Sequence, residues 1–303
     1  MKESREKEKE IILLDAGDLL FGRFSNPYPS RELEMVTQKA SLIIESFNRM
    51  GYDGVGIGDD DLSLGKKFLV EVSKKAKFPF ISSNLIDEES RALLFQPYLL
   101  KGVNGLRVGI FSVISPDTFS GPSDPRMKGL VIRDPIETAQ KIVKELRSQT
   151  DLIILLSHLG HPKDVQVSET IRGINLIVGS HSGHHLVFPS IVKNTAIVQT
   201  AFKGMFGGRL DLTLLDKNDT FYNMASKYSL ERELKELRDR LTSTIVSESE
   251  KADLRKTMEG VEQQLRQFQG ENFFTHLLTP LDEQFEDHPD IKKMIDAFKK
   301  RFP

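Results

Sequence analysis

Two histidines and a set of aspartates stand directly after apolar runs of the sequence. Five of the seven histidines lie between 158 and 185, and none lies before 158. His158 and His181 have small neighbours, which leave room for a ligand, whereas a packing role favours bulky neighbours. Carboxylates hold the equivalent places after two earlier apolar runs, at Asp18 and at 59–61.

The chemistry that these groups offer is the binding of a divalent cation. The chain has no cysteine, so thiolate metal sites, cysteine nucleophiles, iron–sulfur clusters and disulfides are excluded. Two carboxylates and two imidazoles suit a borderline or hard ion such as Mn, Fe, Zn or Ni. The three aspartates at 59–61 repel one another unless a cation or a buried hydrogen-bond network compensates. Their competing interpretation is an acidic cap at the start of a helix.

The elements that must position these side chains are the strands of an α/β domain. Short apolar runs alternate with amphipathic stretches as far as about residue 215, the pattern of sheets covered by helices. Because ligands bind beyond the carboxyl ends of such strands, we expect the four polar loops to converge. The predicted strands are 11–15, 54–57, 78–82, 106–114, 152–156, 176–178, 191–199 and 208–215, and the predicted helices are 32–50, 66–75 and 135–148.

The composition narrows the classes of function. Of the 303 residues, 39% are hydrophobic and 28% are charged, which is ordinary for a soluble globular protein. The net charge of -2 argues against a nucleic-acid partner, because phosphate binding needs a basic surface. No apolar run approaches the roughly 20 residues of a membrane span. The charged first ten residues are unlike a leader peptide.

The pattern of the sequence changes after about residue 227. Leucines and other apolar residues recur at intervals of three and four between 230 and 268, with a polar break at 247–250. This spacing predicts a helical hairpin with an apolar seam and charged outer faces. We expect this hairpin, residues 228–270, to pack on itself, on a second copy or on a protein partner. A last short helix is predicted over 289–302.

The order and the residue types of the polar loops resemble the sequence motifs of one known family. Residues 13–22 look like the Gly-Asp motif of the calcineurin-like metallophosphoesterases, in their 5′-nucleotidase branch. Residues 48–65, with Gly-Tyr-Asp and Gly-Asp-Asp-Asp, resemble the next motif. The segments 78–84, 156–160 and 179–184 match further motifs of that branch. The resemblance covers about residues 10–215 in the right order.

The resemblance implies a four-layer αββα sandwich with a metal site at the strand ends and a phosphomonoester substrate, such as a 5′-nucleotide. Asp18 matches the family's bridging ligand, and Asp59, His158 and His181 match the other ligands of one ion. Asp59 replaces an asparagine, a change expected to tighten a divalent ion. The implied cofactor is Mn, Zn, Fe, Ni or Mg, as one ion, with a second left open.

Other positions depart from the family pattern. Asp60 stands where the resemblance implies the catalytic histidine, and His184 lies one residue late for a further ligand, so these two are the candidate catalytic residues. Asn84 ends one matching segment and is the candidate substrate-binding residue. Nothing matches the Asp-x-His pair of the family's first strand, so the second metal site is expected to be incomplete.

Three interpretations of the function remain open. The chain is a metal-dependent phosphoesterase with an incomplete dinuclear site, an inactive protein of the same fold that acts as a binding module, or a fragment of a longer enzyme. The metallophosphoesterase domain is predicted over 1–220, without its first strand, and the helical part over 228–303. The resemblance further implies a periplasmic or exported protein.

Overall fold

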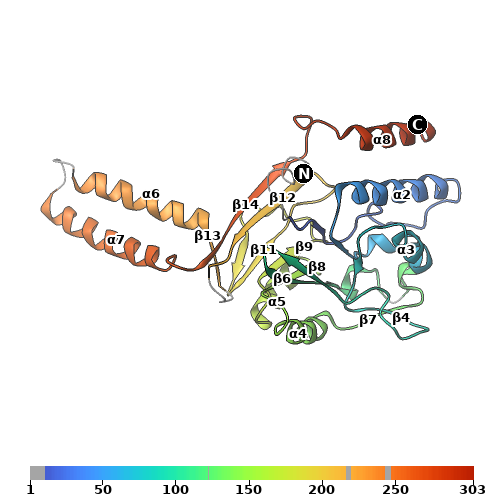
Figure 1. Ribbon diagram of the computed structural model, residues 1–303, viewed down its shortest axis with the longest axis horizontal. Helices are drawn as coiled ribbons and strands as arrows, with labels where there is room; N and C mark the ends of the chain where they lie inside the picture. Colours follow the sequence, from blue (N-terminus) through green and yellow to red (C-terminus); the bar gives the residue numbers. More distant parts are fainter. Residues whose placement is uncertain (1–10, 122, 216–219, 243–246) are drawn as a thin grey trace. The chain divides into compact units, whose positions relative to one another are not determined.

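The computed structural model describes residues 11–121, 123–215, 220–242 and 247–303. The first ten residues, on which the expectation of no leader peptide rests, lie outside these ranges. The chain divides into two units, one comprising the chain as far as Gly207 together with Pro280–Pro303, the other Gly208–Thr279 (Figure 1). Within the described ranges, no helix combines the length and the apolar character needed to cross a membrane.

Two largely parallel sheets form the centre of the first unit. One has six strands in the order β10-β11-β9-β8-β6-β5, and the other has the order β1-β2-β3. A separate antiparallel pair is formed by β4 and β7. The bounds are β1 Leu14–Asp15, β2 Gly54–Gly56, β3 Phe80–Ile81, β4 Leu85–Asp87, β5 Tyr98–Val103, β6 Leu106–Ile114, β7 Leu130–Ile132, β8 Leu152–His158, β9 Leu176–Gly179, β10 Ser190–Val192 and β11 Thr195–Val198.

The two central sheets pack face to face. A Cβ atom added at Gly56 on β2 would approach the hydroxyl of Ser112 on β6 to 2.8 Å and the Cβ of Leu156 on β8 to 3.3 Å. Glycine therefore permits the close approach of the sheets at this point. Every residue of β8 is buried, as expected for a strand covered on both faces.

Helices cover the outer faces of both sheets. The helices α2 (Leu33–Met50) and α3 (Gly65–Ser73) share one core with β2 and β3, whereas α4 (Pro135–Leu146) and α5 (His161–Thr170) share another with β6, β8 and β9 (Figure 1). Helix α4 is amphipathic and turns its apolar face to the sheet, and Asp134 caps its first turn. The predicted four-layer αββα sandwich is confirmed.

The second unit contains the predicted helical hairpin. Its helices are α6 (Met224–Leu241) and α7 (Glu248–Arg266), and a capping box of Ser247 and Glu250 begins α7. The buried seam between them consists of Leu234, Leu237, Leu254 and Val261. The three- and four-residue spacing of the apolar residues therefore predicted this pair correctly. Residues 243–246 lie outside the described ranges.

One predicted strand differs from the structure, some strands were not predicted, and the last predicted helix is present. The run 191–199 is a hairpin of β10 and β11 rather than one strand, because the chain turns at Lys193, whose φ is +52°. The segments β13 (Phe221–Asn223) and β14 (Asn272–Pro280) were predicted as no strand, yet they pair in a sheet with β12 (Phe206–Thr213). The helix α8 (Pro289–Arg301) belongs to the first unit and pairs with α2 through Arg49 and Asp290. The domain boundary at 220 remains a prediction.

Candidate metal centre

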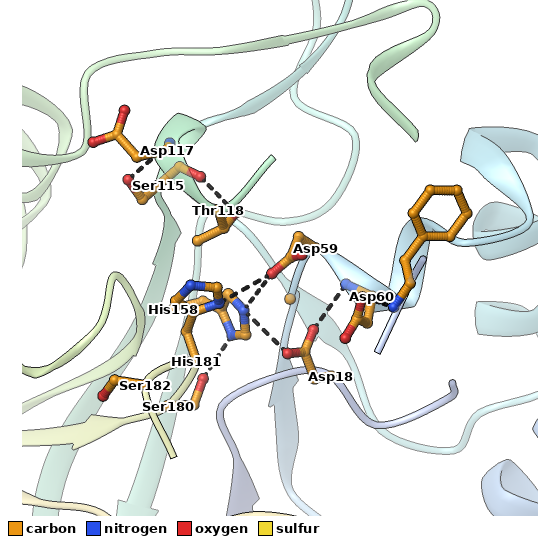
Figure 2. A network of polar contacts seen from close by, with 12 residues as sticks. Asp18, Asp59, Asp60, Ser115, Asp117, Thr118, His158, Ser180, His181 and Ser182 are labelled. Carbon is orange, nitrogen blue, oxygen red and sulfur yellow. Dashed lines mark hydrogen bonds and ion pairs between the residues drawn. The ribbon is translucent and has the colours of Figure 1, made fainter. Parts of the chain in front are cut away.

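Four predicted ligands meet at the carboxyl ends of β1, β2, β8 and β9. Asp18, Asp59, His158 and His181 each offer one ligand atom, and these atoms lie within 4.8 Å of one another (Figure 2). The parallel register explains the meeting, because Ile114 on β6 pairs with His158 and Ser157 pairs with Gly179. The four loops therefore leave the sheets at one edge, as the rule for α/β proteins predicts.

The backbone at this edge is held in conformations that ordinary residues avoid. Asp18 and His181 both have left-handed backbone, with φ of +61° and +67°. A Cβ atom at Gly58 would overlap both the carboxylate and the backbone nitrogen of Asp18. Such conformations cost free energy and persist where the surroundings impose them, often at functional sites. Gly58 thus lets the loop of Asp18 lie directly against the loop of Asp59.

The environment of His158 fits a bound cation. Its ring is fully buried, and its Nδ1 lies 2.6 Å from the Ser180 hydroxyl, which itself donates to the Ala16 carbonyl. With Nδ1 donating to Ser180, Nε2 points at carboxylate oxygens of Asp59 at 2.9 Å and Asp18 at 3.3 Å. Facing two acceptors, Nε2 needs either a proton or a cation beside it. The donor set therefore suits a divalent ion of the borderline class.

In the ion-free protein, the proton takes the place of the cation at His158. Burial alone lowers the pKa of this imidazole, but the charges of Asp18 and Asp59 outweigh burial and raise its pKa to about 9. Burial raises the pKa of Asp18 to about 7. Burial also acts to raise the pKa of Asp59, yet hydrogen bonds from His158 and His181 hold it well below its usual range. Asp59 therefore stays charged at pH values at which Asp18 takes up a proton.

The three successive aspartates at 59–61 have different hydrogen-bond partners. The buried carboxylate of Asp61 accepts backbone N–H groups from Asp18 at 2.9 Å, Gly58 at 3.0 Å and Leu20 at 2.9 Å. Asp59 stands before a short 3₁₀ helix, η1 (Asp60–Leu62), but its side chain makes no capping hydrogen bond. The helix-cap interpretation is therefore wrong for Asp59, and backbone hydrogen bonds compensate the charge of Asp61.

Arg126 is a site residue that the sequence analysis missed. Its guanidinium is only 4% exposed and its Nη1 donates to Asp59 at 2.6 Å and to Asp60 at 3.1 Å. It lies on the short helix η3 (Pro125–Met127), which Asp124 caps. No local pattern distinguished this segment from an ordinary loop, and its partners Asp59 and Asp60 lie more than 60 positions away in the sequence.

The other three candidate residues, Asp60, His184 and Asn84, are not among the four ligands. Asp60 accepts the Phe24 N–H at 2.8 Å as well as Arg126, and its own N–H donates to Asp18 (Figure 2). The exposed His184 contacts the hydroxyl of Ser182 through Nδ1 at 2.8 Å. Asn84 is fully buried and donates both amide hydrogens to backbone carbonyls of Ile114 and Arg133, which gives it a structural role. Its predicted contact with substrate remains a prediction.

Curated relatives of this chain are phosphoesterases. The chain is 24% identical to the trifunctional nucleotide phosphoesterase protein YfkN of Bacillus subtilis, over 99% of this chain and 19% of that protein. It is 28% identical to a 5′-nucleotidase of Vibrio cholerae, over 66% of this chain and 40% of the relative. It is 30% identical to the uncharacterized metallophosphoesterase YunD of Bacillus subtilis, over 70% and 44%. The chain thus spans less than half the length of these relatives.

Solved structures share the fold. A 5′-nucleotidase precursor from Thermus thermophilus matches with a TM-score of 0.61 and 29% identity, over 72% of this chain and 45% of that one. The calcineurin-like phosphoesterase YfkN from Bacillus subtilis matches with a TM-score of 0.65 over 99% of this chain and 86% of that one, at 16% identity, which supports the fold alone. No protein-family model matches the sequence.

Proposed function

Because the chain belongs to the family of 5′-nucleotidases and calcineurin-like metallophosphoesterases, we propose that it hydrolyses a phosphomonoester, such as a 5′-nucleotide, with the help of a divalent ion. Asp18, Asp59, His158 and His181 would hold one ion of Mn, Zn, Fe, Ni or Mg. The observation that carries the proposal is the buried Nε2 of His158, which faces two carboxylates while Nδ1 is already engaged.

Each residue of the site has a distinct task in this proposal. When bound, the ion supplies positive charge that polarises a phosphoryl oxygen and lowers the pKa of a bound water. Asp59 and Asp18 supply the negative charge that holds the ion, and Ser180 fixes the tautomer and the orientation of His158. Arg126 offsets the charge of Asp60, so that a phosphate dianion meets less repulsion there.

A second candidate is a protein of the same fold that binds ligand without efficient hydrolysis. The observation that favours it is the carboxylate of Asp60, which stands where the family pattern has a histidine and is already paired with Arg126. A positioned general acid or base contributes about 10²–10⁴-fold to a rate, so its loss leaves hydrolysis slow. Slow turnover with retained ion binding is the signature of this candidate.

Hydrolysis of p-nitrophenyl phosphate and of a 5′-nucleotide, with Mn²⁺ and after removal of ions by EDTA, tests the first candidate. We expect Mn²⁺-dependent phosphate release that is lost in Asp18→Asn. Asp117→Asn is the matched control, because Asp117 is exposed and pairs with Lys163 rather than with the ligands. Ion binding without phosphate release would favour the second candidate, and absence of both would contradict the proposal.

The activity of the whole protein is part of the proposal, because the chain matches less than half the length of its curated relatives. An exported location is proposed from the resemblance to the 5′-nucleotidases. A second copy or a protein partner is proposed to bind through residues 228–270. The two helices bury their apolar seam between themselves, so the partner would contact their outer faces.

A further inference from the structure

Carboxylates and aromatic rings enclose the guanidinium of Arg126. Its Nε and Nη2 donate to the two oxygens of Asp124 at 3.0 and 2.8 Å, while Nη1 donates to Asp59 and Asp60. The rings of Phe24 and Phe119 cover its guanidinium, with centroids 4.7 and 5.0 Å from Cζ. One cation therefore lies among three carboxylates with aromatic rings against it, a combination that stabilises a buried positive charge.

The carboxylate of Asp59 is divided between two positive neighbours. Its Oδ2 accepts from Arg126 at 2.6 Å, whereas its Oδ1 faces His158 at 2.9 Å and His181 at 3.3 Å. Only Oδ1 is directed at the candidate metal centre. The guanidinium thus offsets part of the extra charge that Asp59 brings relative to an asparagine, and the tighter ion binding expected from the sequence remains a prediction.

Without the guanidinium, three buried carboxylates would face one another. Asp59, Asp60 and Asp124 are each at most 8% exposed. Burying such charges without a partner is costly, so the group would take up protons or bind another cation. Carboxylate oxygens that converge in this way are ligands for hard divalent ions such as Mg²⁺ and Mn²⁺.

We propose that Arg126 determines how many ions this centre binds. Its guanidinium occupies the place of a divalent cation among Asp59, Asp60 and Asp124. The centre therefore binds only the ion that Oδ1 of Asp59 faces. The inference rests on the proposed function for that one ion. The guanidinium itself is an internal, permanent cation, which differs from a metal ion in that chelators cannot remove it. Arg126 therefore supplies one positive charge beside Asp59 whether or not metal is present.

The test is the number of Mn²⁺ ions bound per chain, measured by elemental analysis after dialysis and by titration calorimetry. We expect Arg126→Met to bind one more ion than the wild type, because the aliphatic side chain keeps the packing between the rings but removes the charge. Arg126→Lys retains the charge and should bind the wild-type number. Lys66→Met is the matched control, since it removes a partly buried cation that pairs with Asp87, and should leave the number unchanged.

The outcomes of this experiment test the inference and the proposed function separately. A folded Arg126→Met that binds the same number of ions as the wild type overturns the inference, as does an extra ion in Arg126→Lys. An Arg126→Met protein that folds only when Mn²⁺ is added supports it. If Arg126→Met folds under neither condition, Arg126→Gln decides, because its neutral amide still donates to Asp124 and one added ion is again expected. A wild type without any ion would contradict the proposed function, while the added ion in the variant would still support the inference.

Discussion

The metal centre and the α6–α7 hairpin obtain their order in opposite ways. The centre is made of loops after buried strands, with left-handed Asp18 and His181, a glycine contact at Gly58 and several buried charges. The hairpin is made of two regular helices with one apolar seam and a capping box. The centre carries conformational and electrostatic strain that regular secondary structure avoids, and the hairpin carries almost none.

The difference shows where local sequence determines structure and where distant residues do. In the hairpin, each residue's conformation agrees with its own propensity and with its neighbours three and four positions away. At the centre, conformations are imposed by hydrogen bonds between segments far apart in the chain, such as Asp18 with Asp61 and His158 with Ala16. Mutations of the buried residues at the centre should therefore affect ion binding and folding together, whereas mutations in the hairpin should affect folding alone.

The largest effect is expected from Gly58→Ala. The added Cβ overlaps the backbone and carboxylate of Asp18, so the two loops must separate, at a cost of about 3 kcal/mol in unfolding free energy. Ion binding should be lost at the same time. The matched control is Gly260→Ala in α7, where a Cβ meets nothing within 4 Å and helix propensity should instead stabilise by about 0.5–1 kcal/mol. Urea unfolding and calorimetric ion titration measure both, and a Gly58→Ala protein with intact ion binding would contradict this reading of the loop contact.

The second effect is expected from Leu237→Ala in the hairpin seam. This side chain is 8% exposed and packs in the seam, so its truncation should cost about 2 kcal/mol of unfolding free energy. Ion binding should be unchanged, because none of the four ligands belongs to the hairpin. Urea unfolding checks the first part and ion titration the second. A changed ion affinity would show that the two regions are energetically coupled.

The third effect is the pH dependence of ion binding. Since the pKa of His158 is about 9 in the ion-free protein, an ion must displace its proton, and affinity should rise about tenfold per pH unit between pH 7 and 9. Below about pH 7, Asp18 is protonated as well, so the slope should become steeper. Because the folded pKa of His158 is raised, its protonation stabilises the ion-free fold at low pH, and this contribution is lost as pH rises through about 9. Calorimetric titration with Mn²⁺ at several pH values measures the slope, and a flat profile would exclude His158 as a ligand.

The smallest effect is expected from Ser247→Ala at the start of α7. Ser247 accepts the Glu250 N–H at 3.3 Å and closes the capping box, so its loss should cost about 1 kcal/mol of unfolding free energy. Ser247→Asp should restore most of this stability, because aspartate is a comparable cap. Thermal unfolding of the two variants provides the comparison, and equal midpoints for Ser247→Ala and the wild type would refute a stabilising cap.

The sequence predicted those features that depend on local pattern. Apolar runs followed by small and polar residues located Asp18, the aspartates at 59–61, His158 and His181 at the strand ends, and the family resemblance singled out Asp59. Leucine spacing located the hairpin. The strand β14 was missed although its residues 272–280 include two phenylalanines and two threonines, residue types that are common in strands. Its position directly after a helical pattern hid that signal.

Arg126 could not be predicted in this way. An arginine after Asp-Pro in a loop reads as a solvated charge, and nothing near it in the sequence indicates that two phenylalanines and three aspartates enclose it. The same holds for the hydrogen bond of Ser180 to His158, since Ser180 resembles any small loop residue. Contacts of this kind become visible only when the fold has brought the segments together.

The central claim is that Asp18, Asp59, His158 and His181 bind one divalent ion. It is tested most directly by calorimetric titration of Mn²⁺ into the ion-free wild type, His181→Ala and His184→Ala. His181 is partly exposed, so its truncation should leave the fold intact, and the exposed His184 lies outside the four ligands. We predict one ion per chain for the wild type and for His184→Ala, and at least tenfold weaker binding for His181→Ala. Equal affinities for wild type and His181→Ala, or no binding by the wild type, would contradict the claim.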